Sequence, residues 1–540
     1  MTKKTDVLAA LAMFVAASAF AADPSVKVSL SPIERPATGT TTTEIRATVT
    51  NNSAQLVSLI DLRIALYNGA KASQLLARGT NPWRCVGGGR SFICESQQAP
   101  SQSLGAHQSV ELLFDLTAAN EGEFELHAYA LWRIGNEPVI SPEALQTALF
   151  YRELAVTNTR DGGEGSLRAA LAASRTCSEA EVPCRVSFAI DEPLPDEGWY
   201  TIRPETPLPV IGGQGMRLHY LLDATTQPPS NPLGPEVALD GSALAAGNGL
   251  EVRGIGVARV RGLAIGNFPG NGIEYDFFTP GRAVRSGIED NFIGTDAAGL
   301  HARPNGGRGI SSLDDSGIAS VARNLISGNA RSGIFLEKCY EIDIVANMIG
   351  VDRTGAPLPN GASGIYFGPR AQYSKVASNL IAYNRQFGLA ISRQANHIHV
   401  NPNSIAHNGV LGIDVGLDGF SGDKYDDYNT SNAYIPPPSL LSAKFDPVTG
   451  ITTIRGRHLA SIPYYFLSTI TVYANDVDEA QGNSYVGTAE VSADESFTLE
   501  VARDLRGKFL AAYGQRTLHL GWSGDFFFNS EFTPKTLLVE

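Results

Sequence analysis

A glycine followed by isoleucine or leucine recurs through the middle of the chain, and its spacing constrains the fold more than any other feature. Successive recurrences are 23, 37, 24, 31, 24 and 24 residues apart, so the basic period is about 24 residues with two longer intervals. A repeat of this size, with short strand-like runs between turns, predicts a solenoid of stacked coils. The recurring glycines are Gly249, Gly272, Gly309, Gly333, Gly364, Gly388 and Gly412.

An asparagine runs in phase with the glycine, and a second Asn or Asp follows it five residues later. Asparagine tolerates the left-handed turn conformation, and its amide can hydrogen-bond to neighbouring coils. The apolar residues before the first marker alternate and should point inward. The first marker is Asn291, Asn324, Asn347, Asn379 and Asn403, and the second is Asp296, Asn329, Asp352, Asn384 and Asn408.

The stretch from Val156 to Leu171, with Asn291–Gly299 and Ile349–Gly355, resembles secreted bacterial right-handed parallel β-helix proteins of the pectin-lyase-like class. The resemblance covers about residues 154–436 and implies a helix that caps the N-terminal end of the solenoid. The residues agree, because Leu167, Ala170 and Leu171 share one apolar face after Ser166 as N-cap. The resemblance implies no particular activity, since many activities share this scaffold.

Alternating strand patterns lie on both sides of the repeat. Residues 43–50, 109–116, 451–456, 467–474 and 496–501 show them, and short strands at this spacing indicate β-sandwiches. The segment from Trp83 to Gly105 also resembles immunoglobulin-like modules of bacterial surface and secreted proteins. We therefore predict an all-β chain with a signal peptide (1–21), an immunoglobulin-like β-sandwich (22–150), a right-handed parallel β-helix with a cap helix (151–435) and a C-terminal β-sandwich (436–540).

The N-terminus predicts export. Lys3 and Lys4 precede an apolar run from Val7 to Ala22 that ends in a small-x-small site, which is typical of a secretory signal peptide. No later apolar run is long enough to span a membrane. We expect an extracellular, periplasmic or cell-surface protein, with no membrane span after signal removal.

Export permits disulfides, and four of the five cysteines form two close pairs. We expect the fifth, Cys339, to be a buried inert thiol. The predicted disulfides are Cys85–Cys94 and Cys177–Cys184.

The net charge is −13, from 42 basic and 55 acidic residues, which argues against a nucleic-acid partner. We expect a monomer.

Two columns counted back from the first asparagine marker gather chemically active side chains. Positions four and six residues before it should face solvent on one sheet, because the columns beside them are apolar. Carboxylates, a lysine, an aromatic ring and histidines can supply acid, base and sugar-stacking groups. An ordinary solvated strand face is the alternative. The predicted catalytic residues are Glu341, Asp343, Lys375 and His399, and the predicted substrate-binding residues are Tyr373 and His397, with Arg370 and Arg393 from a nearby charged turn.

Roles within these columns depend on the reaction. A lyase or epimerase acting on a uronic acid would use Lys375 or a histidine as base. A hydrolase would need the Glu341 and Asp343 carboxylates, which lie about 7 Å apart on one strand.

The two lengthened repeats end alike, in Pro304-Asn-Gly306 and Pro359-Asn-Gly361. Both excursions leave the same corner and can wall a groove for an extended ligand. Alternatively, Asp296 and Asp352 simply form Asx turns in repeated structural loops.

An acidic stretch broken by glycine follows Gly412, and its oxygen ligands suit Ca²⁺. A solvated linker is the alternative, and we predict no other cofactor. The candidate calcium ligands are Asp414, Asp418 and Asp423.

Catalytic signatures of characterised relatives are missing. The chain lacks the Trp-Ile-Asp-His and Arg-x-Pro-x-x-Arg segments of pectate and pectin lyases, and the Asp-Pro-His-Asp of mannuronan epimerases. We therefore predict a β-helix protein that binds extended polysaccharide or a cell-surface glycan, as adhesin or scaffold. The alternative is a polysaccharide lyase, epimerase or glycoside hydrolase that acts on the β-helix face.

Overall fold

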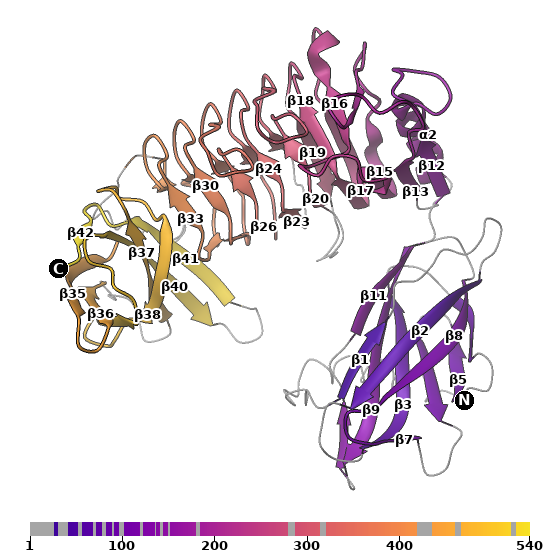
Figure 1. Ribbon diagram of the computed structural model, residues 1–540, viewed down its shortest axis with the longest axis horizontal. Helices are drawn as coiled ribbons and strands as arrows, with labels where there is room; N and C mark the ends of the chain where they lie inside the picture. The colour runs from indigo at the N-terminus through magenta and orange to yellow at the C-terminus, as the bar shows by residue number, and fades with distance from the viewer. Residues whose placement is uncertain are drawn as a thin grey trace. The chain divides into compact units, whose positions relative to one another are not determined.

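The computed structural model divides the chain into two compact units, Met1–Arg152 and Glu153–Glu540 (Figure 1). It describes residues 26–30, 42–51, 57–67, 72–77, 83–88, 91–96, 102–118, 123–134, 137–140, 144–149, 152–179, 184–278, 287–313, 320–417, 419, 435–458, 466–519 and 525–540. The predicted signal peptide lies outside these residues. Among the helices in the described ranges, none combines the length and the apolar character needed to cross a membrane.

The N-terminal unit consists of two antiparallel sheets. Alternating residues of β2 and β8, such as Val49 and Phe114, are fully buried, which explains the period-two pattern. One sheet has the order β1 (Val26–Leu30), β2 (Thr42–Asn51), β8 (Ser109–Ala118), β4 (Ala72–Ala77). The other has the order β10 (Glu137–Ile140), β9 (Glu123–Ile134), β3 (Val57–Tyr67), β6 (Ser91–Ser96), β5 (Trp83–Gly88), with β7 (Gln102–Leu104) and β11 (Ala144–Leu149) beside this path.

Three of the four cysteines predicted to pair lie on strands, and Cys177 lies in the helix Leu167–Glu179. Cys85 lies opposite Cys94 in the β5–β6 hairpin, but their side chains lie outside the described residues. Cys184 is buried and disulfide-bonded, and the side chain of Cys177 is also outside the described residues. Both pairings therefore remain predictions. Cys339 is a free, buried cysteine, and burial raises the pKa of its thiol to about 12, as expected of an inert thiol.

The second unit contains the β-helix, in which each full coil contributes one strand to each of three parallel faces (Figure 1). Face one comprises β19 (Ile273–Phe278), β22 (Ile310–Ser312), β25 (Ile334–Leu336), β28 (Ile365–Phe367), β31 (Leu389–Ser392) and β34 (Ile413–Gly416). Face two comprises β20 (Gly287–Glu289), β23 (Ser320–Ala322), β26 (Asp343–Val345), β29 (Lys375–Ala377) and β32 (His399–Val400). Face three comprises β14 (Tyr200–Ile202), β16 (Val237–Asp240), β18 (Leu263–Gly266), β21 (Phe292–Ile293), β24 (Leu325–Ile326), β27 (Met348–Ile349), β30 (Leu380–Ala382) and β33 (Ser404–Ala406).

The first coils differ because one long strand replaces two short ones. The start of β17 (Leu250–Arg261) pairs with β19 of face one, and its end pairs with β20 of face two. Before it come β15 (Ile211–Asp223), β13 (Cys184–Phe188) and β12 (Arg152–Val156), in pairing order. The predicted fold class is confirmed: a right-handed parallel β-helix stands between two β domains in the sequence.

Two buried amide ladders join the coils. The first is the predicted one, in which each asparagine accepts from the backbone N–H and the side-chain amide of the one before it. The second departs from the sequence marker, because the Asn of each Pro-Asn-Gly takes the ladder position in place of Asp296 and Asp352. Its members are Asn305, Asn329, Asn360, Asn384 and Asn408.

The cap helix forms as expected. Helix α2 spans Leu167–Glu179, and Ser166 Oγ accepts from the Ala169 N–H at 3.2 Å. Leu167 and Leu171 are fully buried in the same core as the β-helix strands.

The C-terminal domain also has two antiparallel sheets, but it closes the last coil and forms one compact unit with the β-helix. Asn408 donates from its backbone and side chain to Gln481 Oε1 at 3.0 and 3.1 Å, so Gln481 continues the second ladder. Gly482 pairs with Ile405 through two backbone bonds, which protects the open edge. The sheets are β35 (Ser439–Asp446), β36 (Ile451–Arg457), β39 (Ser496–Val501), and β38 (Ser484–Glu490), β37 (Phe466–Asn475), β40 (Phe509–His519), β41 (Asp525–Phe532), with β42 (Leu537–Leu538) on β40.

A buried histidine in this domain predicts acid sensitivity. His458 is 1 % exposed, and burial, with a smaller effect of Arg516, lowers its pKa to about 4. The unfolded chain therefore takes up a proton near pH 6.5 that the folded domain excludes, and stability falls as the pH drops from 6.5 towards 4. We expect a loss of about 2 kcal/mol at pH 5 from this group, which His458→Gln should remove. Thermal unfolding of both proteins at pH 7 and pH 5 measures it; equal pH dependence would contradict the assignment.

Candidate functional site

One of the two predicted columns lies on face two, and the other lies in the turns just before its strands. Ser320, Asp343, Lys375 and His399 are paired in register on four adjacent strands. Before the strands, Glu341, Tyr373 and His397 each occupy a left-handed turn position, with φ of 55°, 53° and 55°. The rings of Tyr373 and His397 stack with centroids 4.9 Å apart. The expectation that Glu341 and Asp343 share one strand is wrong, because the left-handed turn at Glu341 ends before β26 begins at Asp343.

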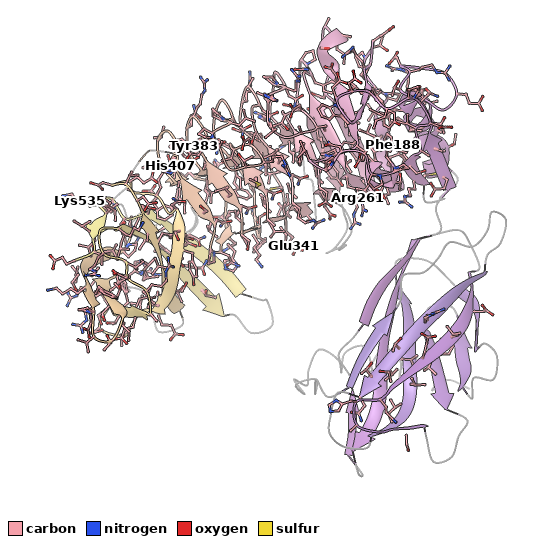
Figure 2. The ribbon with its side chains drawn as sticks, viewed as in Figure 1. Phe188, Arg261, Glu341, Tyr383, His407 and Lys535 are labelled. Atoms are coloured by element: carbon pink, nitrogen blue, oxygen red, sulfur yellow. The ribbon has the colours of Figure 1, made fainter. Side chains whose placement is uncertain are left out.

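The electrostatics of these columns favour a neutral pair of histidines. Burial, with a smaller effect of Lys375, lowers the pKa of His399 to about 4, and burial lowers the pKa of His397. Glu341 and Asp343 are exposed to solvent, and Figure 2 shows Glu341 at the margin of the coils.

Two well-formed cavities among the described residues, one near β14 and one near Ile413, contain none of the predicted catalytic or substrate-binding residues. Arg370 and Arg393 are exposed in the turns before face two. The catalytic and binding roles of all these residues remain predictions.

The calcium prediction can be examined at one residue. Asp414 lies fully buried on β34, and its Oδ1 accepts from the Leu417 N–H at 3.1 Å. Asp418 and Asp423 lie outside the described residues. Within the described part of the chain, no three His, Cys, Asp or Glu side chains come together as a metal site.

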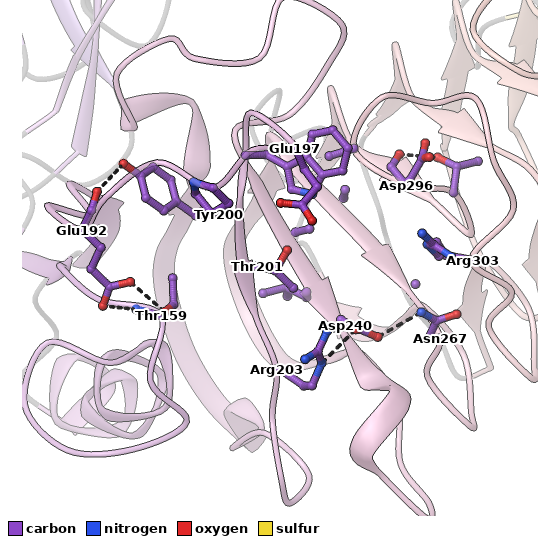
Figure 3. Close-up of a pocket in the computed structure, with 18 of the residues that line it drawn as sticks. Thr159, Glu192, Glu197, Tyr200, Thr201, Arg203, Asp240, Asn267, Asp296 and Arg303 are labelled. Atoms are coloured by element: carbon purple, nitrogen blue, oxygen red, sulfur yellow. Dashed lines mark hydrogen bonds and ion pairs between the residues drawn. The ribbon is translucent and has the colours of Figure 1, made fainter.

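A groove of about 480 Å³ lies instead on the outer side of face three, near the N-terminal end of the β-helix (Figure 3). Its floor is the outward column Thr201, Ala238 and Ala264, which pair in register on β14, β16 and β18. The same column continues as Phe292 and Leu325 in the next coils. Small side chains in three adjacent strands therefore leave the hollow.

One end of the floor carries a fixed ion pair. Arg203 donates to Asp240 Oδ2 from Nε and Nη2 at 3.0 and 2.8 Å, and Asp240 Oδ1 accepts from Asn267 and the Ser242 N–H (Figure 3). Burial alone would raise the pKa of Asp240, but these hydrogen bonds outweigh it and lower the pKa below its usual range. The carboxylate is therefore a permanent anion.

The walls come from two loops. Thr159 donates to Glu192 from its N–H and its Oγ1, which fixes the wall beside β14. The opposite wall is the loop of the first lengthened repeat, in which Asp296 accepts from the backbone of Leu300 and from His301 Nδ1. Gly266 lets this loop approach, because a Cβ there would lie 2.5 Å from that of Arg303.

Apart from Glu192, whose carboxylate accepts from Thr159, two charged lining residues have no ion pair with any other described residue: the Glu197 carboxylate and the Arg303 guanidinium, both exposed. Figure 3 shows them on different sides of the groove, and Trp199 adds an aromatic ring to the lining. Tyr200 also lines the groove, and such a mixture of aromatic rings and a few polar groups is typical of ligand sites.

Sequence reasoning finds one wall of this groove and misses the rest. It raises the possibility that both lengthened repeats wall one groove; residues 295–297 and Arg303 of the first line this groove, and no residue of the second does. The Asx-turn interpretation of Asp296 and Asp352 also fits, since Asp352 accepts from Thr354 and Ala356. Two of the three floor residues, Thr201 and Ala238, lie before Gly249, where the repeat has no marker, and Ala264 lies in the coil of Gly249. The sequence signal that could have located this floor is the small residue at the outward position of each strand, together with the nearby Trp199.

Comparisons with known proteins give the following likenesses. A family model described as "Periplasmic copper-binding protein (NosD)" matches residues 298–432. The chain is a parallel β-helix protein. No curated protein matches it.

Among solved structures, the β-helix protein is similar to two mannuronan C-5 epimerase A-modules from Azotobacter vinelandii. The AlgE6 module is 13 % identical, covers 48 % of this chain and 71 % of its own, and has a TM-score of 0.28. The AlgE4 module is 13 % identical, covers 48 % and 91 %, and has a TM-score of 0.25. Tailspike protein 2 of Escherichia coli O157:H7 bacteriophage CAB120 is 10 % identical, covers 69 % and 68 %, and has a TM-score of 0.21. The fold assignment rests on the strand topology and not on these scores.

Proposed function

We propose that the β-helix unit of an exported protein binds polysaccharide, as an adhesin or scaffold, in the groove on face three. The observation that carries the proposal is the groove itself, in which Trp199 and the exposed charges of Glu197 and Arg303 surround a floor of small residues. An aromatic ring can stack on a sugar, and charged groups can bond its hydroxyls. The predicted signal peptide and the periplasmic description of the family matched by residues 298–432 support export.

Catalysis has less support than binding. Asp240, the carboxylate at the floor, is held ionised by Arg203, Asn267 and Ser242, which suits a fixed anion better than a proton donor. Copper is named for the family whose model matches, and the proposal for the groove makes no use of it.

A binding screen with two aromatic variants tests the proposal and separates the two candidate surfaces. Purified protein is tested against neutral and acidic polysaccharides, and Trp199→Ala is compared with Tyr373→Ala, which removes the exposed ring of the face-two columns. We expect Trp199→Ala to weaken binding at least tenfold, about 1.4 kcal/mol, and Tyr373→Ala to leave it unchanged. The reverse result would place binding on face two.

The same samples test the enzyme alternative. Reducing ends and unsaturated products are followed over time, with and without Ca²⁺. Product release by the native protein that is lost in Glu197→Gln would replace the binding proposal with an enzymatic one.

A further inference from the structure

We infer that the groove holds only a short saccharide segment of two or three sugar residues, and that this segment crosses the β-helix instead of following its axis. This inference rests on the proposed function and adds the length and direction of the ligand. It narrows the sequence-based expectation of an extended ligand, which gave neither a length nor a direction.

The groove is closed at both ends of the row of strands. Beside β14, the hydrogen-bonded pair Thr159 and Glu192 forms one wall, and beyond β18 the loop with Asp296 and Arg303 forms the other. Figure 3 shows these two pairs on opposite sides of the lining. A ligand chain that followed the axis would have to pass through one of these walls.

The column of small residues that forms the floor ends beyond β18. Phe292 is the next outward residue, and its ring is covered, because a Cβ on Gly234 or Gly299 would lie 2.3 or 2.8 Å from Phe292 Cε2. Asn231 Nδ2 donates to Ala297 O at 2.8 Å and ties the two covering loops together. The hollow therefore ends after three strands.

The dimensions limit the ligand. Three strands span two strand spacings, about 10 Å. The volume of about 480 Å³ lies within the range of sites that enclose one small ligand, ~300–1,000 Å³. The span of about 10 Å limits the width of a ligand that lies along the strands, and the volume suits two or three sugar rings.

Polar groups mark the path across the strands. Glu197 comes from the loop before β14, and Arg203, 59 % exposed on its side chain, follows the end of that strand. Figure 3 shows them on either side of Thr201. A segment lying along the strand direction meets an acceptor at one end and a donor at the other, so hydroxyl groups can be bound at both.

Ligand length is the direct test. Cello-oligosaccharides, chito-oligosaccharides and oligogalacturonides of two to eight residues are titrated into the full-length protein by calorimetry. For the series that binds, we expect affinity to rise up to two or three residues and then to stay within about twofold. A steady increase up to eight residues would overturn the inference while leaving the proposed function intact. If neither these oligomers nor any polysaccharide binds, the proposed function fails and the inference fails with it.

A bulky substitution in the floor of the groove gives a second test. Ala238→Phe places in the groove the ring that Phe292 carries in the same column, and we expect at least tenfold weaker binding of every oligomer that binds. Leu380→Phe puts the same ring in this column on β30, outside the groove, and should bind as the native protein does. Equal binding by both variants would show that the ligand lies elsewhere; the length series needs no variant and does not depend on their folding.

Discussion

Asn347→Ala is expected to destabilise the β-helix unit by about 4 kcal/mol, because it interrupts a buried ladder in two directions. Asn347 Oδ1 accepts from the backbone N–H and the side chain of Asn324 at 2.9 and 3.0 Å. Its Nδ2 donates to Val321 O at 2.8 Å and to Asn379 Oδ1 at 2.9 Å. Alanine leaves several of these buried groups without a partner, and each such group costs about 1–3 kcal/mol.

Asp352→Ala is the matched control, because Asp352 occupies the second marker of the same repeat but lies in a loop. Its Oδ1 accepts from Thr354 and Ala356 near solvent, so we expect a loss of about 1 kcal/mol or less. Chemical unfolding of the two variants beside the native protein measures the difference. Equal losses would mean that the buried ladder stabilises the coils no more than an exposed turn does.

The contrast between Asn347 and Asp352 shows which positions of the amide ladders can be predicted from residue spacing alone. A marker counted along the chain finds Asn347 because the turn between faces two and three has a constant length. The turn after face three is longer in two coils, and there Asn305 and Asn360 replace the counted Asp296 and Asp352 in the ladder. Counting residues from one marker to the next therefore identifies the ladder residue only in coils whose turn has no insertion.

The candidate sites also differ in whether they depend on the constant register of the strands or on the variable loops. The columns through Asp343, Lys375 and His399 were predictable, because parallel strands in constant register place equivalent positions side by side. Concavity was not predictable, because it depends on loops that cover or leave open a face. The groove arises from small residues in three coils, of which only the last, with Ala264, has a repeat marker. Loops from two separate parts of the chain bound it.

Gly388→Ala is expected to destabilise the β-helix by about 3 kcal/mol, because the recurring glycine leaves no room for a side chain. A Cβ at Gly388 would lie 2.5 Å from Ile405 Cγ2, 2.7 Å from Gly412 O and 2.8 Å from Asn408 Nδ2. Two of these atoms belong to the next coil's backbone and to the amide ladder, so neither can move without breaking hydrogen bonds. The glycine marker thus records close stacking of coils.

Gly162→Ala provides the comparison, since a Cβ at Gly162 would meet no atom within 4 Å and the backbone φ there is not in the left-handed region. We expect a change within about 0.5 kcal/mol there. Urea unfolding of both variants decides the matter, with circular dichroism to verify that each is folded. If Gly388→Ala proved as stable as Gly162→Ala, the coils could separate by several tenths of an ångström, and close stacking would no longer explain why glycine recurs at this position in every coil from Gly249 to Gly412.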